Sequence, residues 1–208
     1  MRTRIKICGV RDAEAARVVA ECGGDAVGFV FVEGSPRSIE PEAAAEILLD
    51  LPLFLWSVGL MVNPTEDLFE EVIETCPTTH TQLQGTESGS FVESVGPNII
   101  KAVAFDEKRV ENDLKRWSSA DGVDAVLVDG SAGGQGVAFD WSKLAAVRGA
   151  CSKPLIVAGG LTPDNVGEAV RAVRPFAVDV SSGVESSRGV KDPELIAAFC
   201  DAVRRADG

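Results

Sequence analysis

A cysteine and two aspartates lie at the ends of apolar runs in this sequence, where their side chains could do acid–base chemistry. Cys8 follows "RIKI", Asp129 follows "AVLV", and Asp179 lies within "AVDV". Side chains on a strand alternate between its two faces, so each polar group points away from the neighbouring aliphatic ones. A thiol and a carboxyl that face one pocket form a base and an acid, which can remove a proton from one substrate atom and deliver one to another.

Two glycine- and serine-rich segments could bind phosphate without basic side chains. "AGGLTPDN" contains Gly159 and Gly160 ahead of a predicted helix, and "SSGVESSRG" contains Ser182 and Gly183. Backbone N–H groups and the N-terminus of a helix can hold an anion. One such segment is more often a turn, but the two together favour a phosphate site. A third segment, "GGQG" at 133–136, lacks the lysine of a Walker loop and is either a lid or a plain loop.

Eight short apolar runs, each followed by a stretch of helical period, must position these side chains. The predicted strands cover residues 4–10, 26–31, 54–62, 79–84, 99–105, 125–129, 155–158 and 176–180. Helices are predicted to begin near residues 12, 41, 65, 87, 107, 141, 162 and 192, and the fourth is short or irregular. Eight units favour a closed, parallel (β/α)8 TIM barrel, an α/β fold with a single domain over 1–208, rather than an open doubly wound sheet.

The barrel prediction also selects one face as the working face. Polar and glycine residues crowd at the carboxyl ends of the predicted strands, where barrel enzymes carry their sites. The two glycine- and serine-rich segments follow strands seven and eight, the usual place for phosphate in this fold. Cys8, Asp129 and Asp179 all face the barrel mouth, and Asp179 is therefore placed with the substrate.

The charge balance argues against nucleic acid and membrane partners. Lys and Arg number 20 against 32 Asp and Glu, a formal net charge of −12, and the basic residues form no stripe. Acidic residues gather on the predicted helices at 66–74 and 107–113, which indicates solvated helix faces. Because arginines outnumber lysines, the surplus also suggests a halophilic-like acidic surface suited to a high-salt cytosol.

The cysteines and the single histidine do not indicate a metal site. The five cysteines are widely spaced without a C-x-x-C pair, and His80 alone cannot supply a multi-histidine site. We expect no metal and no cofactor. No run of about 18 apolar residues and no signal-peptide pattern is present, so we expect a cytoplasmic protein, either a monomer or a homodimer.

The ordered set of motifs resembles the phosphoribosylanthranilate isomerase family. The matching segments run almost end to end: "KICG", "GFVF" with "SPRSI", "QLQG", "VLVDG" with "GGQGVAFDW", "AGGLTPDNV" and "VDVSSGVESSRGVKD". The resemblance implies an intramolecular oxidoreductase, an aldose–ketose isomerase of tryptophan biosynthesis, whose partner is a small phosphosugar. It would convert N-(5-phosphoribosyl)anthranilate to 1-(2-carboxyphenylamino)-1-deoxyribulose 5-phosphate by an Amadori rearrangement.

The resemblance also implies roles for single residues. Cys8 would be the general base and Asp129 the general acid. Arg37, in "SPR", would lie against the anthranilate carboxylate. The phosphate would lie among Gly160, Ser182 and Gly183. The family usually has "QLHG" where this chain has "QLQG", so Gln84 stands in place of a histidine.

Two details of the acid–base pair need support from neighbouring residues. A thiol with a pKa of about 8.5 needs a nearby cation, Lys6 or Arg4, to act as a base near neutral pH. An aspartic acid with a pKa of about 3.9 must be held protonated, by burial or by repulsion from Asp179 if the two carboxyls lie close.

Other functions with the same fold stay open from the residues alone. These are a phosphosugar epimerase, an indole-glycerol-phosphate synthase-like barrel and a barrel that binds phosphate without catalysis. The single histidine disfavours metal-dependent epimerisation. The synthase is disfavoured because the strand ends "AVLVD" and "LMV" carry no lysine.

Overall fold

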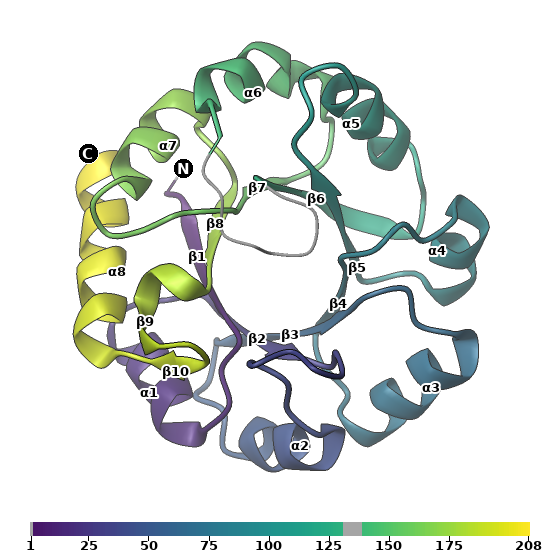
Figure 1. Ribbon diagram of the computed structural model, residues 1–208, viewed down its shortest axis with the longest axis vertical. Helices are drawn as coiled ribbons and strands as arrows, with labels where there is room; N and C mark the ends of the chain where they lie inside the picture. The colour runs from purple at the N-terminus through teal and green to yellow at the C-terminus, as the bar shows by residue number, and fades with distance from the viewer. Residues whose placement is uncertain (1, 131–138) are drawn as a thin grey trace.

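Eight parallel strands close into one barrel in the computed structural model, which describes residues 2–130 and 139–208 (Figure 1). The strands are β1 (Arg4–Cys8), β2 (Ala26–Val30), β3 (Trp56–Met61), β4 (His80–Leu83), β5 (Ile99–Ala104), β6 (Val123–Asp129), β7 (Leu155–Val157) and β8 (Ala177–Val180). Each strand pairs with the next, and β8 pairs back onto β1, which closes the sheet. The predicted TIM barrel is confirmed.

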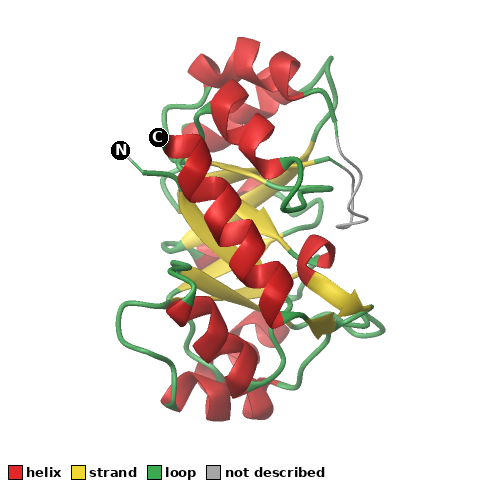
Figure 2. Ribbon diagram, turned by 90° about the vertical axis from the view of Figure 1, so that its left-hand side faces the viewer, coloured by secondary structure: helices red, strands yellow, loops and turns green. Residues whose placement is uncertain are grey.

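Eight helices of the described residues form a ring around the strands (Figure 1). They are α1 (Ala13–Glu21), α2 (Pro41–Leu49), α3 (Glu66–Thr75), α4 (Gly89–Val95), α5 (Val110–Ser118), α6 (Trp141–Val147), α7 (Val166–Val173) and α8 (Pro193–Asp207). Short elements follow α6 and β8: the 3₁₀ turns η1 (Arg148–Ala150) and η2 (Ser182–Val184), and a hairpin of β9 (Glu185–Ser187) and β10 (Val190–Lys191). Figure 2 shows α8 crossing the outside of the barrel.

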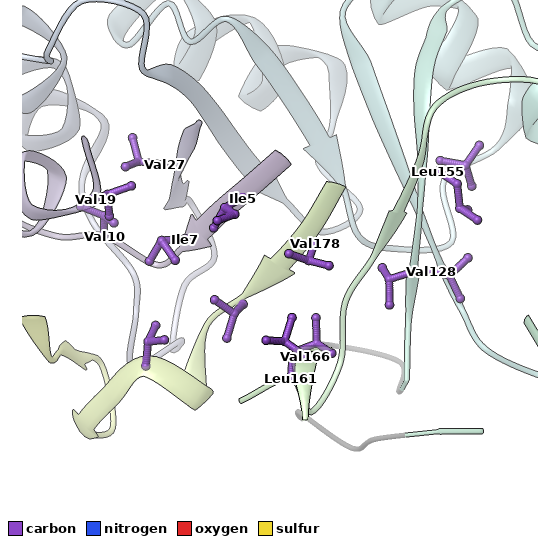
Figure 3. Close-up of a cluster of buried hydrophobic side chains, with 14 of the residues drawn as sticks. Ile5, Ile7, Val10, Val19, Val27, Val128, Leu155, Leu161, Val166 and Val178 are labelled. Atoms are coloured by element: carbon purple, nitrogen blue, oxygen red, sulfur yellow. The ribbon is translucent and has the colours of Figure 1, made fainter. Parts of the chain in front are cut away.

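Alternation along the strands separates the main core from the site. Ile5 and Ile7 of β1 are buried with Val178 of β8 between the strands and the helices (Figure 3). Lys6 and Cys8, the residues between and after them, face the barrel interior, as the pattern predicts. Burial of apolar surface between the strands and the helices stabilises the fold by about 25 cal/mol for each Å² removed from water. The polar face of β1 is therefore held by the packing of its apolar face.

Small and large aliphatic side chains together fill the barrel interior below the site. Alanines alternate there with larger aliphatic residues in a second buried cluster: Val58, Ile100, Ala102, Ala125, Leu127, Ile156, Ala158 and Ala177. In β6, Leu127 belongs to this inner cluster, whereas Val126 and Val128 belong to the outer one. Asp129, two residues after Leu127, therefore faces the barrel mouth above this cluster.

The fourth helix shows why sequence patterns misplace helix starts. It begins at Gly89 rather than near residue 87, because the Ser88 hydroxyl accepts a hydrogen bond from the Phe91 N–H at 3.1 Å and caps the helix. Glu87 instead forms a buried ion pair with Lys101 at 2.9 Å. The helix has 7 residues, which confirms that it is short.

The amino ends of the strands present exposed apolar side chains. Phe54 is 96% exposed and Leu53 is 89% exposed in the segment before β3. Trp56 stacks on His80 with ring centroids 5.1 Å apart, and His80 Nε2 lies 3.5 Å from Asp124. These contacts are structural, at the end of the barrel opposite to the predicted site.

The acidic residues of α3 lie on its exposed face, as predicted: Glu66, Asp67, Glu70, Glu71 and Glu74. The opposite face of the helix packs Phe69 and Val72 into the core. The interpretation of this charge as a high-salt adaptation stays a prediction. Among the helices of residues 2–130 and 139–208, none has the length and apolar character needed to cross a membrane.

Candidate active site

A cavity of about 390 Å³ opens at the carboxyl ends of the barrel strands. Seven of the eight predicted site residues line it: Cys8, Arg37, Asp129, Gly159, Gly160, Asp179 and Ser182. They come from five different strand ends or the loops that follow, and only the closed barrel brings them together. The remaining one, Gly183, packs against the loop after β7, where a Cβ would come within 1.9 Å of the Leu161 carbonyl oxygen.

Cys8 lies at the end of β1 with its thiol turned inward. It pairs in register with Gly28 of β2, and a Cβ at Gly28 would approach Cys8 Sγ to 2.9 Å and Lys6 Cε to 3.2 Å. The glycine therefore provides the space in which both side chains fit. Lys6 lies one layer below the thiol, and its Nζ donates to Asp179 Oδ1 at 2.9 Å.

The protonation of Cys8 is set by burial and by two lysines. Burial and the charge of Asp179 raise the pKa of the thiol, whereas the charges of Lys6 and Lys191 lower it, and the net shift is upward. Burial lowers the pKa of Lys6, but Asp179 and Cys8 more than offset it, so Lys6 stays protonated. Of the two cations expected near the thiol, Lys6 is confirmed. Arg4 instead lies over the Phe176 ring, 4.2 Å from its centroid, below the site.

Asp179 lines the cavity, but its charge is already balanced. Its side chain is 8% exposed and that of Lys6 is 4% exposed, so the ion pair is buried. Burial raises the pKa of Asp179, whereas the charge of Lys6 and its hydrogen bond oppose that rise. The expectation that Asp179 repels Asp129 and so helps to keep it protonated stays a prediction.

Asp129 is part of a hydrogen-bond chain that the sequence did not reveal. Gln84 Nε2 donates to Asp129 Oδ2 at 3.0 Å, and Gln84 Oε1 accepts from Gln82 Nε2 at 2.6 Å. Both glutamines line the cavity. Gln84, which replaces the usual histidine of the resembling family, thus orients the carboxyl group of Asp129.

Gly159 lets the end of β7 approach the end of β6. Its φ is 87°, in the left-handed region, and a Cβ there would come within 2.2 Å of the Gly130 nitrogen and 2.8 Å of Asp129 Oδ1. A side chain at this position would displace the acid. Gly159 therefore shapes the surroundings of Asp129 as well as the cavity wall.

The loop after β7 differs from the prediction. α7 begins at Val166 rather than near residue 162, so its first turn does not directly follow Gly160. Asn165 braces the intervening turn: its Oδ1 accepts from Thr162 N and its Nδ2 donates to the Gly160 carbonyl, both at 2.8 Å. A helix follows the glycine pair, but the predicted start near residue 162 is four residues too early, so the backbone of the two loops remains as the anion-binding candidate.

Arg37 reaches the cavity from the loop after β2 and is held by a residue far away in sequence. Its Nε and Nη2 donate to the two carboxylate oxygens of Glu185 at 2.7 and 2.9 Å. Arg188, in the turn of the β9–β10 hairpin, also lines the cavity. Glu185 and Arg188 were not predicted as site residues, although both lie inside "SSGVESSRG", where only the serines and the glycine indicated a phosphate site.

One sequence hypothesis lies outside the described residues: the "GGQG" segment at 133–136, considered as a lid. Within residues 2–130 and 139–208, no group of three or more His, Cys, Asp or Glu side chains is arranged to hold a metal ion.

Comparisons with known proteins agree with this geometry. The family model described as N-(5'phosphoribosyl)anthranilate (PRA) isomerase matches residues 5–202. A curated N-(5'-phosphoribosyl)anthranilate isomerase of Moorella thermoacetica is 45% identical over 208 residues, covering 98% of this chain and 91% of that protein.

Solved structures extend the likeness to three dimensions. A phosphoribosyl anthranilate isomerase in complex with reduced 1-(o-carboxyphenylamino)-1-deoxyribulose 5-phosphate superposes with a TM-score of 0.84 at 36% identity, covering 98% of this chain and 99% of that one. Monomers generated from the dimeric enzyme of Thermotoga maritima give a TM-score of 0.85 at 35% identity, covering 97% and 98%.

Proposed function

The chain belongs to the N-(5'-phosphoribosyl)anthranilate isomerase family, and from this premise we propose how its own residues perform the reaction. The reaction is the Amadori rearrangement of N-(5'-phosphoribosyl)anthranilate to 1-(2-carboxyphenylamino)-1-deoxyribulose 5-phosphate in tryptophan biosynthesis, an aldose–ketose isomerisation within one molecule. The observation that supports our assignment of roles is that Cys8 and Asp129 face one cavity from different strands.

Asp129 is the proposed general acid and Cys8 the proposed general base. Asp129 gives a proton to the furanose ring oxygen, the C1'–O bond breaks, and the nitrogen lone pair forms an iminium. The Cys8 thiolate then removes the proton from C2', and the electron pair moves to give an enolamine. Tautomerisation of the enolamine gives the ketone. A positioned acid and base each contribute about 10²- to 10⁴-fold to such steps.

The charges around Cys8 support its role as the base. Lys6 and Lys191 lower the pKa of the thiol against burial and the charge of Asp179, which together keep the net shift upward, and Asp179 helps to hold Lys6 protonated. A thiolate formed on this strand end is therefore stabilised by two cations. Asp179, which lines the cavity, acts in this proposal through Lys6, and it also contributes to the substrate-binding wall.

The phosphate is proposed to lie between the loops after β7 and β8. Gly159, Gly160 and Ser182 line this side of the cavity, and Gly183 packs directly behind them. Backbone N–H groups and a serine hydroxyl suit a phosphate in a chain with a net charge of −12. Arg188 supplies a cation at the same mouth.

Arg37 is proposed to bind the anthranilate carboxylate. We expect Arg37→Ala to raise KM at least about tenfold while kcat falls less than about threefold, because the arginine binds the substrate before and after the proton transfers alike. Steady-state kinetics measure both. Arg17→Ala is the matched control, since Arg17 forms an arginine–glutamate pair on the surface of α1 and should leave both constants unchanged. A collapse of kcat with KM intact would contradict a binding role.

The activity itself is tested by mixing purified protein with freshly prepared phosphoribosylanthranilate. We expect enzyme-dependent loss of anthranilate-type fluorescence, in proportion to protein concentration, because rearrangement changes the group attached to the anthranilate nitrogen. Protein lacking both Cys8 and Asp129 is the blank. Turnover equal to the blank would leave the alternatives of another phosphosugar reaction or a barrel that only binds phosphate.

Assembly and location complete the proposal. The chain is a monomer of 21.8 kDa or a homodimer, and the exposed Leu53 and Phe54 support the homodimer, since large exposed apolar groups mark interaction surfaces. Light scattering distinguishes the two masses. We place the protein in the cytoplasm, which its role in amino-acid biosynthesis supports.

A further inference from the structure

Behind the cavity wall, one carboxylate joins two cations that belong to different loops. Glu185, the first residue of β9, accepts from Arg37 through both of its oxygens and from Lys191 Nζ at 2.9 Å. The Glu185 and Lys191 side chains are 4% and 3% exposed, and that of Arg37 is 17% exposed. The anion is thus fully enclosed, while the arginine alone reaches the cavity.

The contact with Glu185 uses one edge of the Arg37 guanidinium and leaves the rest available. A guanidinium carries five N–H donors, and Glu185 takes one from Nε and one from Nη2. No acceptor among the described residues bonds the other three. Two parallel hydrogen bonds to Glu185 prevent the planar guanidinium of Arg37 from rotating, so its remaining N–H groups point in one fixed direction.

The same network reaches the strand end that carries the thiol. Lys191 Nζ donates to the Ser181 carbonyl at 3.0 Å, and the Ser181 hydroxyl donates to the Cys8 carbonyl at 2.9 Å. Glu185 therefore connects the loop after β2 with the ends of β1 and β8. Two cations around one anion leave a net positive charge here, which favours an anionic substrate in an acidic protein.

We propose that Glu185 is the positioning residue for substrate carboxylate recognition: it fixes the Arg37 guanidinium with its free N–H groups toward the cavity. The inference rests on the proposed role of Arg37 and deepens it, because it names the group that gives the arginine its direction. Arg37 and Lys191 hold the pKa of Glu185 at about 2 despite its burial, so the carboxylate is ionised throughout any practical assay range.

The test is a double-mutant cycle on KM and kcat. We expect Glu185→Gln to raise KM at least about tenfold, a loss of about 1.4 kcal/mol, and to change kcat less than about threefold. In the Arg37→Ala background, the same substitution should change KM less than about twofold, since no guanidinium is left to orient. Glu185→Asp keeps the charge but shortens its reach, and it should raise KM while the protein stays folded.

Asp25→Asn is the matched control. Asp25 holds a bidentate pair with Arg2 and accepts from Ile5 N at 2.9 Å, at the amino end of the barrel. The Asp25→Asn substitution should at most change the thermal stability of the protein, and its KM should stay within about twofold of the wild-type value. An equal rise of KM from Glu185→Gln with and without Arg37, or no rise with Arg37 present, would overturn the positioning role. An unchanged KM in Arg37→Ala alone would instead overturn the substrate contact of Arg37, which separates the two failures.

Discussion

Replacing Cys8 with serine is expected to lower kcat by about 10²- to 10⁴-fold, the usual contribution of a general base. A hydroxyl of similar size fits the space beside Gly28, but it does not ionise near neutral pH as a thiol can. The barrel should stay folded, because Ile5 and Ile7 of the same strand keep their packing. Steady-state turnover and thermal unfolding measure the two quantities separately.

Cys22→Ser is the control for this substitution, because Cys22 follows α1 on the outside of the barrel and should leave kcat unchanged. Alkylation of the wild-type protein gives a second measurement. Burial raises the pKa of Cys8, so inactivation by iodoacetamide should be slow at pH 7 and accelerate as the thiol ionises at higher pH. Near-normal turnover in Cys8→Ser would exclude Cys8 as the base.

Asp129→Asn is expected to lower kcat by a similar factor, about 10²- to 10⁴-fold, with KM changed by less than about threefold. The amide keeps the shape of the carboxyl group, and its oxygen can still accept the hydrogen bond from Gln84 Nε2. It cannot deliver an acidic proton to the ring oxygen of the substrate. Single-turnover kinetics should show the loss in the chemical step rather than in substrate binding.

Asp124→Asn provides a matched control on the same strand. Asp124 lies at the amino end of β6, near His80, and the substitution makes the same chemical change at the opposite end of the barrel. It should leave kcat unchanged. If Asp129→Asn retained normal kcat and raised only KM, the residue would bind substrate, and another group would have to open the ring.

The fold was predictable because its signals are local. Each strand of a parallel barrel is buried on both faces and forms a short apolar run, and polar residues gather after each run because the site lies at the carboxyl ends. Helix starts were less predictable. "TPDN" has the composition of a helix start, yet Asn165 closes a turn with Thr162 before α7 begins.

Site residues were predictable from the sequence only where the residue type and its position along the chain indicate a chemical role without reference to a partner. Cys8 and Asp129 are recognisable one at a time at strand ends, Arg37 was identified through the family resemblance, and the structure brings all three to one cavity. Partnerships between distant residues were not predictable. Arg37 and Glu185 are 148 positions apart, and they meet only because β8 closes against β1.

The ion pair of Lys6 and Asp179 illustrates the same limit. Alternation correctly turns Asp179 inward, but alternation does not say which inward group lies opposite. The parallel register of β1 and β8 sets Lys6 directly beside Asp179, 173 positions apart. The structure therefore gives Asp179 a cationic partner that the sequence pattern did not identify.

The contact between Gly159 and Asp129 has a consequence for protein design. A carboxylic acid grafted onto the end of the sixth strand of another (β/α)8 barrel will contact the side chain of the residue that follows the seventh strand. Here any Cβ at position 159 would overlap the Gly130 nitrogen at 2.2 Å. The aspartate and the glycine on the adjacent strand therefore form one transplantable unit, and a graft should move both together.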